Sequence, residues 1–165
     1  MKQVHPISPI WDSRSEILIL GSFPSVKSRE ICFFYGHPQN RFWKVLADVF
    51  GGDVPQTTAQ KRDVLLSNRV AVWDVIQSCE ITGSSDSSIR QVTPNDINIL
   101  LRQAPIRKIF TNGTTAKKLY DRYLLPQTGK EAVLLPSTSP ANASWSLSRL
   151  SERWKTCIKG ELTKD

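Results

Sequence analysis

The sequence predicts an α/β fold of three layers, α/β/α, with a central four-stranded parallel sheet. Four short apolar runs, at residues 16–20, 69–73, 108–111 and 132–135, are continuous enough for strands that are buried on both faces. Segments with helical spacing separate the runs, and such alternation favours a parallel sheet covered by helices. The 165 residues, of which 39% are hydrophobic, suffice for one full core. We therefore expect a single domain over residues 1–165.

The first half of the chain supplies one strand, two helices and a second strand. After the strand at 16–20, apolar side chains recur at helical spacing from residue 41 to Phe50, and Gly51 ends the helix. Asn40 is the expected N-cap of this helix, because its side chain can accept a hydrogen bond from the first turn. A second helix is predicted at 58–67, directly before the strand at 69–73.

The second half continues the alternation. Residues 82–88 read as a polar loop that adds nothing to the core. A helix is expected to open at Thr93 and Pro94 and to run to residue 104, since proline is favoured in a first helical turn. Helices at 115–123 and 147–159 flank the strand at 132–135, which completes the order β-α-α-β-α-β-α-β-α.

Unusual motifs follow all four predicted strands. Carboxyl ends of parallel strands lie at one edge of a sheet, and ligands of open α/β sheets bind there. The motifs are Gly21–Ser25, Asp74, Asn112-Gly113 and Pro136–Pro140. Their placement on one rim indicates a binding site.

Residues 33–43 gather five aromatic side chains, a histidine, an asparagine and an arginine. Gly36 and Pro38 interrupt regular structure in the first half of this stretch. Aromatic side chains in such a loop are poorly placed for pure core packing and well placed to grip a flat group. Phe34 and Tyr35 are therefore candidates to stack on a base, with core packing as the alternative.

Charge and cysteine content limit the class of protein. The net charge of +7 and the pI near 9.5 favour a polyanionic partner, although solubility alone also explains them. No apolar run is long enough for a membrane span, and residues 1–6 do not resemble a signal peptide. Three widely spaced cysteines fit reduced thiols rather than disulfides or a zinc site. We expect a cytoplasmic protein without a metal or another cofactor.

Each polar candidate also has a purely structural explanation. Asn40 serves as an N-cap, which is compatible with a functional role, and His37 alone is more often structural. Arg41 is either a surface charge or a phosphate contact. Asp74 reads as a cap after a strand, and Asn112 before a glycine as a left-handed turn.

The loop between Pro136 and Pro140 is either an ordinary polar turn or a phosphate clamp. No nucleophilic triad, paired carboxylates or metal-ligand spacing is apparent, so no strong general base is visible. This restricts the chemistry to a reaction with a good leaving group that is assisted by positioning and electrostatics.

Three blocks, in their order and spacing, resemble the hypoxanthine-DNA glycosylase family of the uracil-DNA glycosylase superfamily. They are Gly21-Ser22-Phe23-Pro24-Ser25, Gly36-His37-Pro38-Gln39-Asn40-Arg41-Phe42-Trp43 and Leu135-Pro136-Ser137-Thr138-Ser139-Pro140-Ala141-Asn142-Ala143. The resemblance implies a uracil-DNA glycosylase-like fold. Phe23 stands where much of the superfamily has a water-handling Asp or Asn, and Leu135 stands where uracil enzymes have a histidine. Both departures argue against efficient uracil removal.

The resemblance also implies residue roles. Asn40 and Asn112 are the expected catalytic residues. The expected base pocket consists of Gly21, Ser22, Phe23, Pro24, Tyr35, His37 and Asp74. The expected DNA contacts are Ser25, Arg41, Ser137, Thr138, Ser139, Pro140 and Asn142.

The activity that follows is hydrolysis of the N-glycosidic bond of a deaminated base, hypoxanthine first, to leave an abasic site in base excision repair. We identify no lysine suited to a Schiff base, so we expect a monofunctional enzyme that acts as a monomer on DNA and away from membranes. Uracil or ethenoadenine removal by the same fold and a non-catalytic nucleic-acid-binding domain remain alternatives. A small-molecule-binding protein is less favoured, since it would not need the basic charge.

Overall fold

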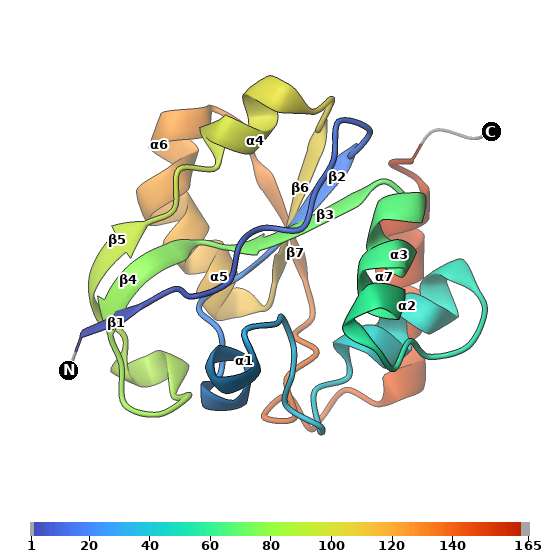
Figure 1. Ribbon diagram of the computed structural model, residues 1–165, viewed down its shortest axis with the longest axis horizontal. Coiled ribbons are helices and arrows are strands. Elements are labelled where there is room, and N and C mark those ends of the chain that lie inside the picture. Colours follow the sequence, from blue (N-terminus) through green and yellow to red (C-terminus); the bar gives the residue numbers. More distant parts are fainter. Residues whose placement is uncertain (1, 163–165) are drawn as a thin grey trace.

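A four-stranded parallel sheet lies at the centre of the computed structural model, which describes residues 2–162. Its order is β3-β2-β6-β7, with every pair parallel (Figure 1). The strands are β2 (Ile17–Gly21), β3 (Val70–Asp74), β6 (Lys108–Asn112) and β7 (Ala132–Leu135). This confirms the predicted sheet.

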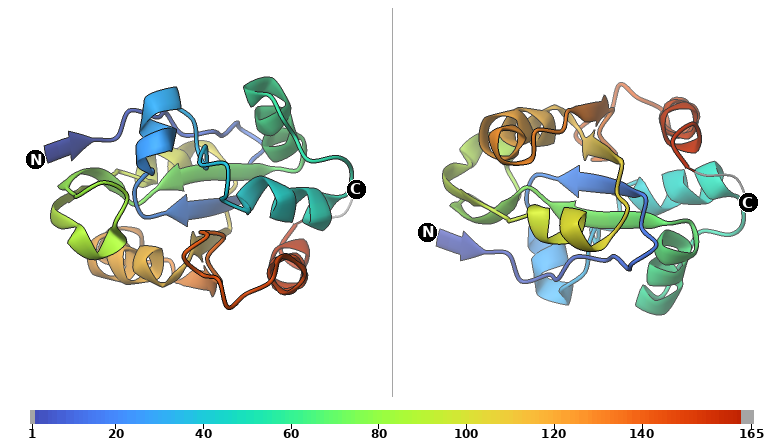
Figure 2. Two further views of the ribbon diagram at one scale, coloured as in Figure 1. Left: turned by 90° about the horizontal axis from the view of Figure 1, so that it is seen from below. Right: turned by 90° about the horizontal axis from the view of Figure 1, so that it is seen from above.

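Alternate side chains of each strand enter cores on opposite faces of the sheet. Ile17 and Ile19 of β2 belong to one core, whereas Leu18 and Leu20 belong to the other. The first core lies under α2 (Phe42–Phe50), α3 (Thr58–Ser67) and α7 (Leu147–Lys159). The second lies under α4 (Asn98–Gln103), α5 (Thr114–Leu119), the π-helical turn Tyr120–Leu124 and α6 (Leu125–Thr128). The two groups of helices stand right and left of the strands in Figure 1, as the three-layer prediction requires, and Figure 2 shows the molecule from below and from above.

Three of the five predicted helices are confirmed; the helices expected at 115–123 and from Thr93 to residue 104 differ from the structure. The helices at 58–67 and 147–159 have the predicted bounds, and the one expected from residue 41 begins at Phe42. The helix expected at 115–123 begins at Thr114 and continues through the π turn into α6. An additional helix, α1 (Val26–Ile31), begins after Ser25, whose side chain accepts a hydrogen bond from the Ser28 amide. Among residues 2–162, none of the helices has the length and apolar character needed to cross a bilayer.

A second, antiparallel sheet was not anticipated. Its order is β1-β4-β5, from β1 (Lys2–Val4), β4 (Ile76–Glu80) and β5 (Arg90–Pro94). The prediction of a helix opening at Thr93 was therefore wrong, because these residues end β5 and α4 starts only at Asn98. Pro94 is tolerated because β5 is an edge strand, where a missing N–H breaks no ladder.

Asp74 lies where the chain passes from one sheet to the other. It is the last residue of β3, and β4 begins two residues later at Ile76. The buried Asn95 side chain donates to the carbonyl oxygens of both residues, at 2.9 and 3.1 Å. The intervening Val75 donates its amide to the Gly21 carbonyl. The backbone on both sides of Asp74 is thereby fixed.

The interpretation of the aromatic stretch needs correction. Four of its five aromatic side chains belong to the first core and are at most 7% exposed, namely Phe33, Phe34, Phe42 and Trp43. Phe42 packs edge-on against Trp154 of α7 and face to face with Tyr35, at centroid distances of 5.8 and 3.9 Å. The aromatic run therefore serves chiefly to seat α2 and its preceding loop on the sheet, and only Phe34 and Tyr35 also reach a cavity.

Candidate active site

A pocket of about 360 Å³ opens at the carboxyl ends of the parallel strands. It is where the sequence placed a site, between the turn after β2, the loop before α2, the ends of β3 and β6, and the loop after β7. The lining residues are Gly21, Ser22, Phe23, Pro24, Ser25, Ser28, Phe34, Tyr35, His37, Asn40, Asp74, Ser84, Asp86, Asn112, Ser137, Thr138, Ser139, Pro140 and Ala141.

All residues assigned to base binding or catalysis from the sequence line this pocket, as do most residues assigned to DNA contact. Arg41 and Asn142 are the exceptions. Asn142 instead lines an adjoining hollow of about 500 Å³, which shares Asp86, Asn112, Ser137, Ser139 and Ala141 with the pocket. The structure thus brings together loops that are far apart in the chain.

Thr138 joins the two candidate catalytic asparagines. The Asn112 Nδ2 group donates to the Thr138 hydroxyl at 3.0 Å, and Asn112 Oδ1 accepts from the Thr138 amide at 3.0 Å. The same hydroxyl donates to Asn40 Oδ1 at 2.8 Å. Thr138 is 0% exposed, which favours a positioning role for its side chain over the phosphate contact expected from the sequence.

These bonds fix how the Asn40 amide is turned. Asn40 Oδ1 accepts both from Thr138 and, at 3.0 Å, from the backbone amide of Phe42, the first residue of α2. The N-terminal bond expected of Asn40 is therefore present, although Arg41 occupies the N-cap position itself. No residue in the range 2–162 uses the Nδ2 group of Asn40, so two donors remain for a ligand or water in the pocket.

We expect Thr138→Val to slow turnover about tenfold, because the isosteric side chain removes the bond to Asn40 and the acceptor for Asn112 at a cost of about 1–2 kcal/mol. The measurement is the rate of product formation in a single turnover, with enzyme in excess over substrate. Thr138→Ser keeps the hydroxyl and should retain most of the rate. If Val and Ser variants react equally fast, the hydroxyl does not position the asparagines.

Arg41 holds the loop after β7 rather than facing the pocket. Its guanidinium donates to the carbonyl oxygens of Ser139 and Asn142, at 2.9 and 3.1 Å, and to that of Trp145. Its Nε adds a long bond to the Thr138 carbonyl, at 3.4 Å. Because these donors are occupied by backbone, Arg41 shapes the rim of the pocket, and a direct phosphate contact is not its main role.

Tyr35 is held in an uncommon backbone conformation, with φ of 51°. The next residue, Gly36, donates its amide to the buried Ser28 hydroxyl at 2.9 Å, which ties the loop to α1. The Tyr35 hydroxyl oxygen is buried and makes no hydrogen bond of normal geometry with any described residue. Burial, and secondarily the charge of Asp74, raise the pKa of Tyr35, while Asn112 acts weakly in the opposite direction. The hydroxyl therefore keeps its proton and is available as a donor.

Two phenylalanines and a histidine form other parts of the wall. Phe23 is 8% exposed, and the Arg29 guanidinium lies 5.4 Å from its ring centroid. Phe34 contributes from the opposite loop. His37 is partly exposed at the rim, where its Nδ1 accepts from the Gln39 amide. The pocket therefore offers flat apolar surfaces as well as polar groups.

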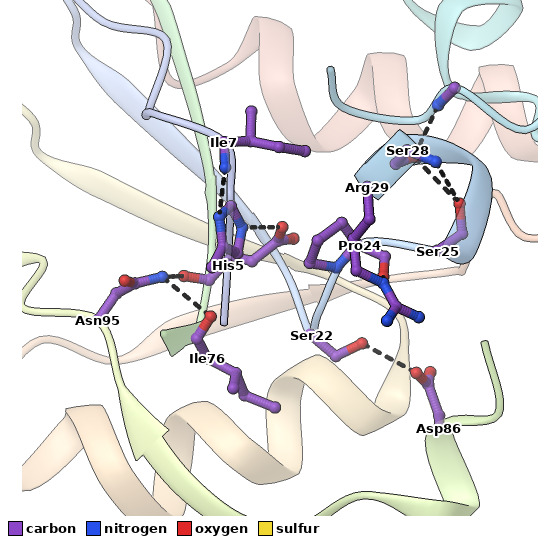
Figure 3. A network of polar contacts seen from close by, with 12 residues as sticks. His5, Ile7, Ser22, Pro24, Ser25, Ser28, Arg29, Ile76, Asp86 and Asn95 are labelled. Atoms are coloured by element: carbon purple, nitrogen blue, oxygen red, sulfur yellow. Dashed lines mark hydrogen bonds and ion pairs between the residues drawn. The ribbon is translucent and has the colours of Figure 1, made fainter. Parts of the chain in front are cut away.

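His5 contacts the pocket-lining residue Asp74, and no sequence pattern had singled it out. Its Nε2 lies 2.7 Å from Asp74 Oδ2, and both side chains are almost fully buried. Its Nδ1 accepts from the Ile7 amide at 3.2 Å (Figure 3). His5 directly follows β1, an edge strand of the antiparallel sheet that the sequence pattern did not predict.

Asp86 was also missed, because residues 82–88 looked like a featureless polar loop. A short 3₁₀ turn, Asp86–Ser88, places its carboxylate at the pocket mouth, where it accepts from the Ser22 hydroxyl at 3.1 Å (Figure 3). Partial desolvation raises the pKa of Asp86, the Ser22 bond opposes this, and Asp74 raises it further. Two carboxylates, Asp74 and Asp86, thus line one pocket, although no paired carboxylates and no strong general base were visible in the sequence.

The raised pKa predicts a pH-dependent effect of Asp86→Asn on stability. A group whose pKa is higher in the folded state stabilises the fold below its unfolded pKa, and this contribution is lost as pH rises through the folded pKa. The Asn variant, which keeps an acceptor for Ser22, should therefore melt at a higher temperature than the parent near neutral pH. The difference should vanish in acid, as measured by thermal unfolding across pH. A gap that persists unchanged at low pH would contradict this account.

The fold and pocket define a class: an open α/β sheet protein with a cavity of about 360 Å³ at the carboxyl ends of its strands, lined by two amide side chains. The model of the uracil DNA glycosylase superfamily matches residues 9–159. The chain belongs to this superfamily.

Named relatives cover nearly the whole chain. A hypoxanthine DNA glycosylase of Methanosarcina acetivorans is 36% identical over 152 residues, which are 91% of this chain and 94% of the relative. One of Methanosarcina barkeri is 33% identical over 153 residues, covering 92% and 95%. The solution NMR structure of a Methanosarcina acetivorans protein, provisionally assigned as a uracil DNA glycosylase, superimposes with a TM-score of 0.81 at 34% identity and covers 97% of this chain and 98% of its own.

Proposed function

We propose that this protein is a monofunctional DNA glycosylase that removes hypoxanthine from DNA and leaves an abasic site in base excision repair. The observation that carries the proposal is the pocket in which Thr138 holds Asn40 and Asn112 together, with the Asn40 donors free. The relatives named hypoxanthine DNA glycosylases, alike over nearly their full length, support the same substrate.

The target nucleotide leaves the duplex and enters the pocket, at a cost of a few kcal/mol that is smallest for a mispaired base. Phe23 and Phe34 supply flat apolar surface for the base, and Tyr35 and Asp74 supply polar groups beside it. The serines and the proline of the loop after β7 lie at the rim, where amides and hydroxyls can contact phosphate. The net charge of +7 favours approach to DNA.

The glycosidic bond then breaks through an oxocarbenium-like sugar, as in other glycoside hydrolyses, and the base leaves as an anion with the electron pair of that bond. The free Nδ2 group of Asn40 holds the attacking water, and Asn112 supports it through Thr138. Asp86 accepts the proton of this water, a role that its raised pKa favours. No lysine is among the pocket-lining residues, which supports base release without strand cleavage.

The same proposal covers the state of the protein. A single copy carries every pocket residue, so we expect a monomeric enzyme that folds as one domain over residues 1–165. The cysteines of the chain are all free thiols, which is consistent with the expected cytoplasmic location.

The test uses end-labelled duplexes that each contain one hypoxanthine, xanthine, uracil or ethenoadenine, with enzyme in excess over DNA. Alkali then converts abasic sites into strand breaks. We expect breaks only after alkali, fastest with hypoxanthine. If uracil or ethenoadenine is released fastest, that base is the preferred substrate of the enzyme instead. Tight binding without an alkali-labile site in any duplex would show a non-catalytic DNA-binding domain and reject the proposal.

A further inference from the structure

We propose that Asp74 and Tyr35 together read the O6 and N1–H edge of a 6-oxopurine, and that His5 is the positioning residue that orients Asp74. The inference rests on the proposed function and deepens it, because it names the groups that separate hypoxanthine from adenine.

Hydrogen bonding fixes the tautomer of His5. Nδ1 accepts a hydrogen bond from the Ile7 amide, so the ring proton must be on Nε2. Nε2–H therefore donates to Asp74 Oδ2, and the imidazole holds the carboxylate without competing for its other oxygen. The exposed fractions of the two side chains are 2% and 5%, so water has little access to this bond.

The other carboxylate oxygen and the Tyr35 hydroxyl lie together above Gly21. A Cβ built on Gly21 would stand 2.3 Å from Asp74 Oδ1 and 3.2 Å from the Tyr35 hydroxyl oxygen. Only glycine permits so close an approach of the two side chains to the backbone. All three residues line the pocket, so an acceptor and a donor lie within 3.2 Å of one point on its wall.

Neither group has a hydrogen-bond partner elsewhere in the part of the chain that is described. Asp74 bonds to His5 through Oδ2 alone, and the Tyr35 hydroxyl is buried without a partner. An unpaired buried donor costs about 1–3 kcal/mol, so folded proteins seldom retain one without a function. A ligand that supplies an acceptor to Tyr35 and a donor to Asp74 would satisfy both.

Hypoxanthine presents this pattern along one edge, with O6 as acceptor and N1–H as donor. Adenine reverses both positions, because its 6-amino group donates and its N1 accepts. Asp74 and Tyr35 would therefore oppose the edge of an intruding adenine. Guanine shares the O6 and N1–H edge. It is excluded instead by the free-energy cost of flipping it out of a stable base pair.

His5 is itself held rigidly. The centroid of its ring lies 5.9 Å from the ring centroids of both Phe23 and Phe34, which line the pocket. It precedes residue 9, where the match to the superfamily model begins, so that match assigns it no role. The backbone of its partner is fixed by Asn95, and only the side chain of Asp74 needs the histidine for its orientation.

The test is equilibrium binding to duplexes whose target nucleotide carries a 2′-fluorine, which slows cleavage by destabilising the oxocarbenium-like state. One duplex carries hypoxanthine and the other adenine, each mispaired. In Asp74→Asn, His5 still donates to the side-chain oxygen, so the new amide nitrogen replaces Oδ1 and presents a donor. We expect the preference for hypoxanthine over adenine to fall at least about tenfold, whereas Asp121→Asn, at an exposed i,i+4 pair, leaves it unchanged.

Substitutions of Tyr35 and His5, each with a matched control, keep the inference testable if Asp74→Asn folds poorly. Tyr35→Phe deletes a hydroxyl that has no hydrogen-bond partner among residues 2–162, so the variant should fold normally and still lose the preference for hypoxanthine over adenine. The control Tyr123→Phe should keep that preference. His5→Phe should lower the preference and His5→Gln, which retains a donor, should restore part of it. Equal weakening of both duplexes by His5→Phe would show a structural role only. If the parent excises hypoxanthine but Asp74→Asn and Tyr35→Phe keep the full preference, the inference fails while the proposed function stands.

Discussion

Asn40→Ala is expected to lower the single-turnover rate of hypoxanthine release by about 10²–10³-fold, the loss typical of removing one preorganised donor from an active site. The physical reason is the orientation of the amide. Thr138 and the Phe42 amide occupy its oxygen, and its Nδ2 group faces the pocket with no protein partner in the described chain. The DNA affinity of the variant should stay within a fewfold of the parent value, because phosphate contacts are retained.

Stability and chemistry must be separated in this variant. Loss of the bond to Phe42 is also loss of a cap, which costs about 0.5–2 kcal/mol of folding free energy. Asn68→Ala provides a matched control, since it removes an amide that bonds the Val64 carbonyl at the end of α3, away from the pocket. The control should melt earlier but retain the parent rate. An Asn40→Ala enzyme that is as fast as the parent would refute the catalytic assignment.

The sheet was predictable because burial on both faces leaves a strong local signal. Continuous apolar runs such as Ile17–Leu20 admit few alternatives, and β2 feeds alternate side chains into two cores. Parallel topology then fixes where the loops meet, so Phe23, Asn40 and Asn112 were placed in one pocket without coordinates.

The second sheet was not predictable from the same signals. Strand β5 alternates weakly in burial and ends at Pro94, which resembles a helix start when only local preferences are considered. Its identity depends on pairing with β4, a contact that local sequence does not encode. The role of His5 was missed for the same reason, because the pairing of β1 with β4 brings the N-terminal segment next to Asp74.

Loop composition also misled the interpretation of the aromatic stretch and of residues 82–88. Gly36 and Pro38 suggested exposure for side chains that tertiary packing buries, including Phe33 and Trp43. The polar run suggested no role for Asp86, whose position at the pocket depends on its contact with Ser22 across the chain. Both errors concern long-range contacts that override local preference.

Arg41→Ala is expected to destabilise the fold by about 3 kcal/mol and to weaken DNA binding at least about tenfold. The guanidinium bonds four carbonyl oxygens of the loop after β7, and removal of a charged donor leaves these acceptors without a partner. Because the loop forms the rim of the pocket, its disorder should reduce affinity and the rate together. Chemical denaturation and equilibrium binding measure the two effects.

The salt dependence of binding distinguishes this structural role from a phosphate contact. Removing one phosphate contact reduces the slope of log K against log salt concentration by about one. Since backbone carbonyls occupy the Arg41 guanidinium, we expect little change in slope for Arg41→Lys, together with most of the stability loss, because an ammonium cannot reproduce the planar fork. Arg102→Ala, at an exposed position on α4, serves as the control for loss of one positive charge. If Arg41→Lys instead lowers the slope of log K against log salt concentration by about one and leaves stability unchanged, Arg41 contacts a DNA phosphate.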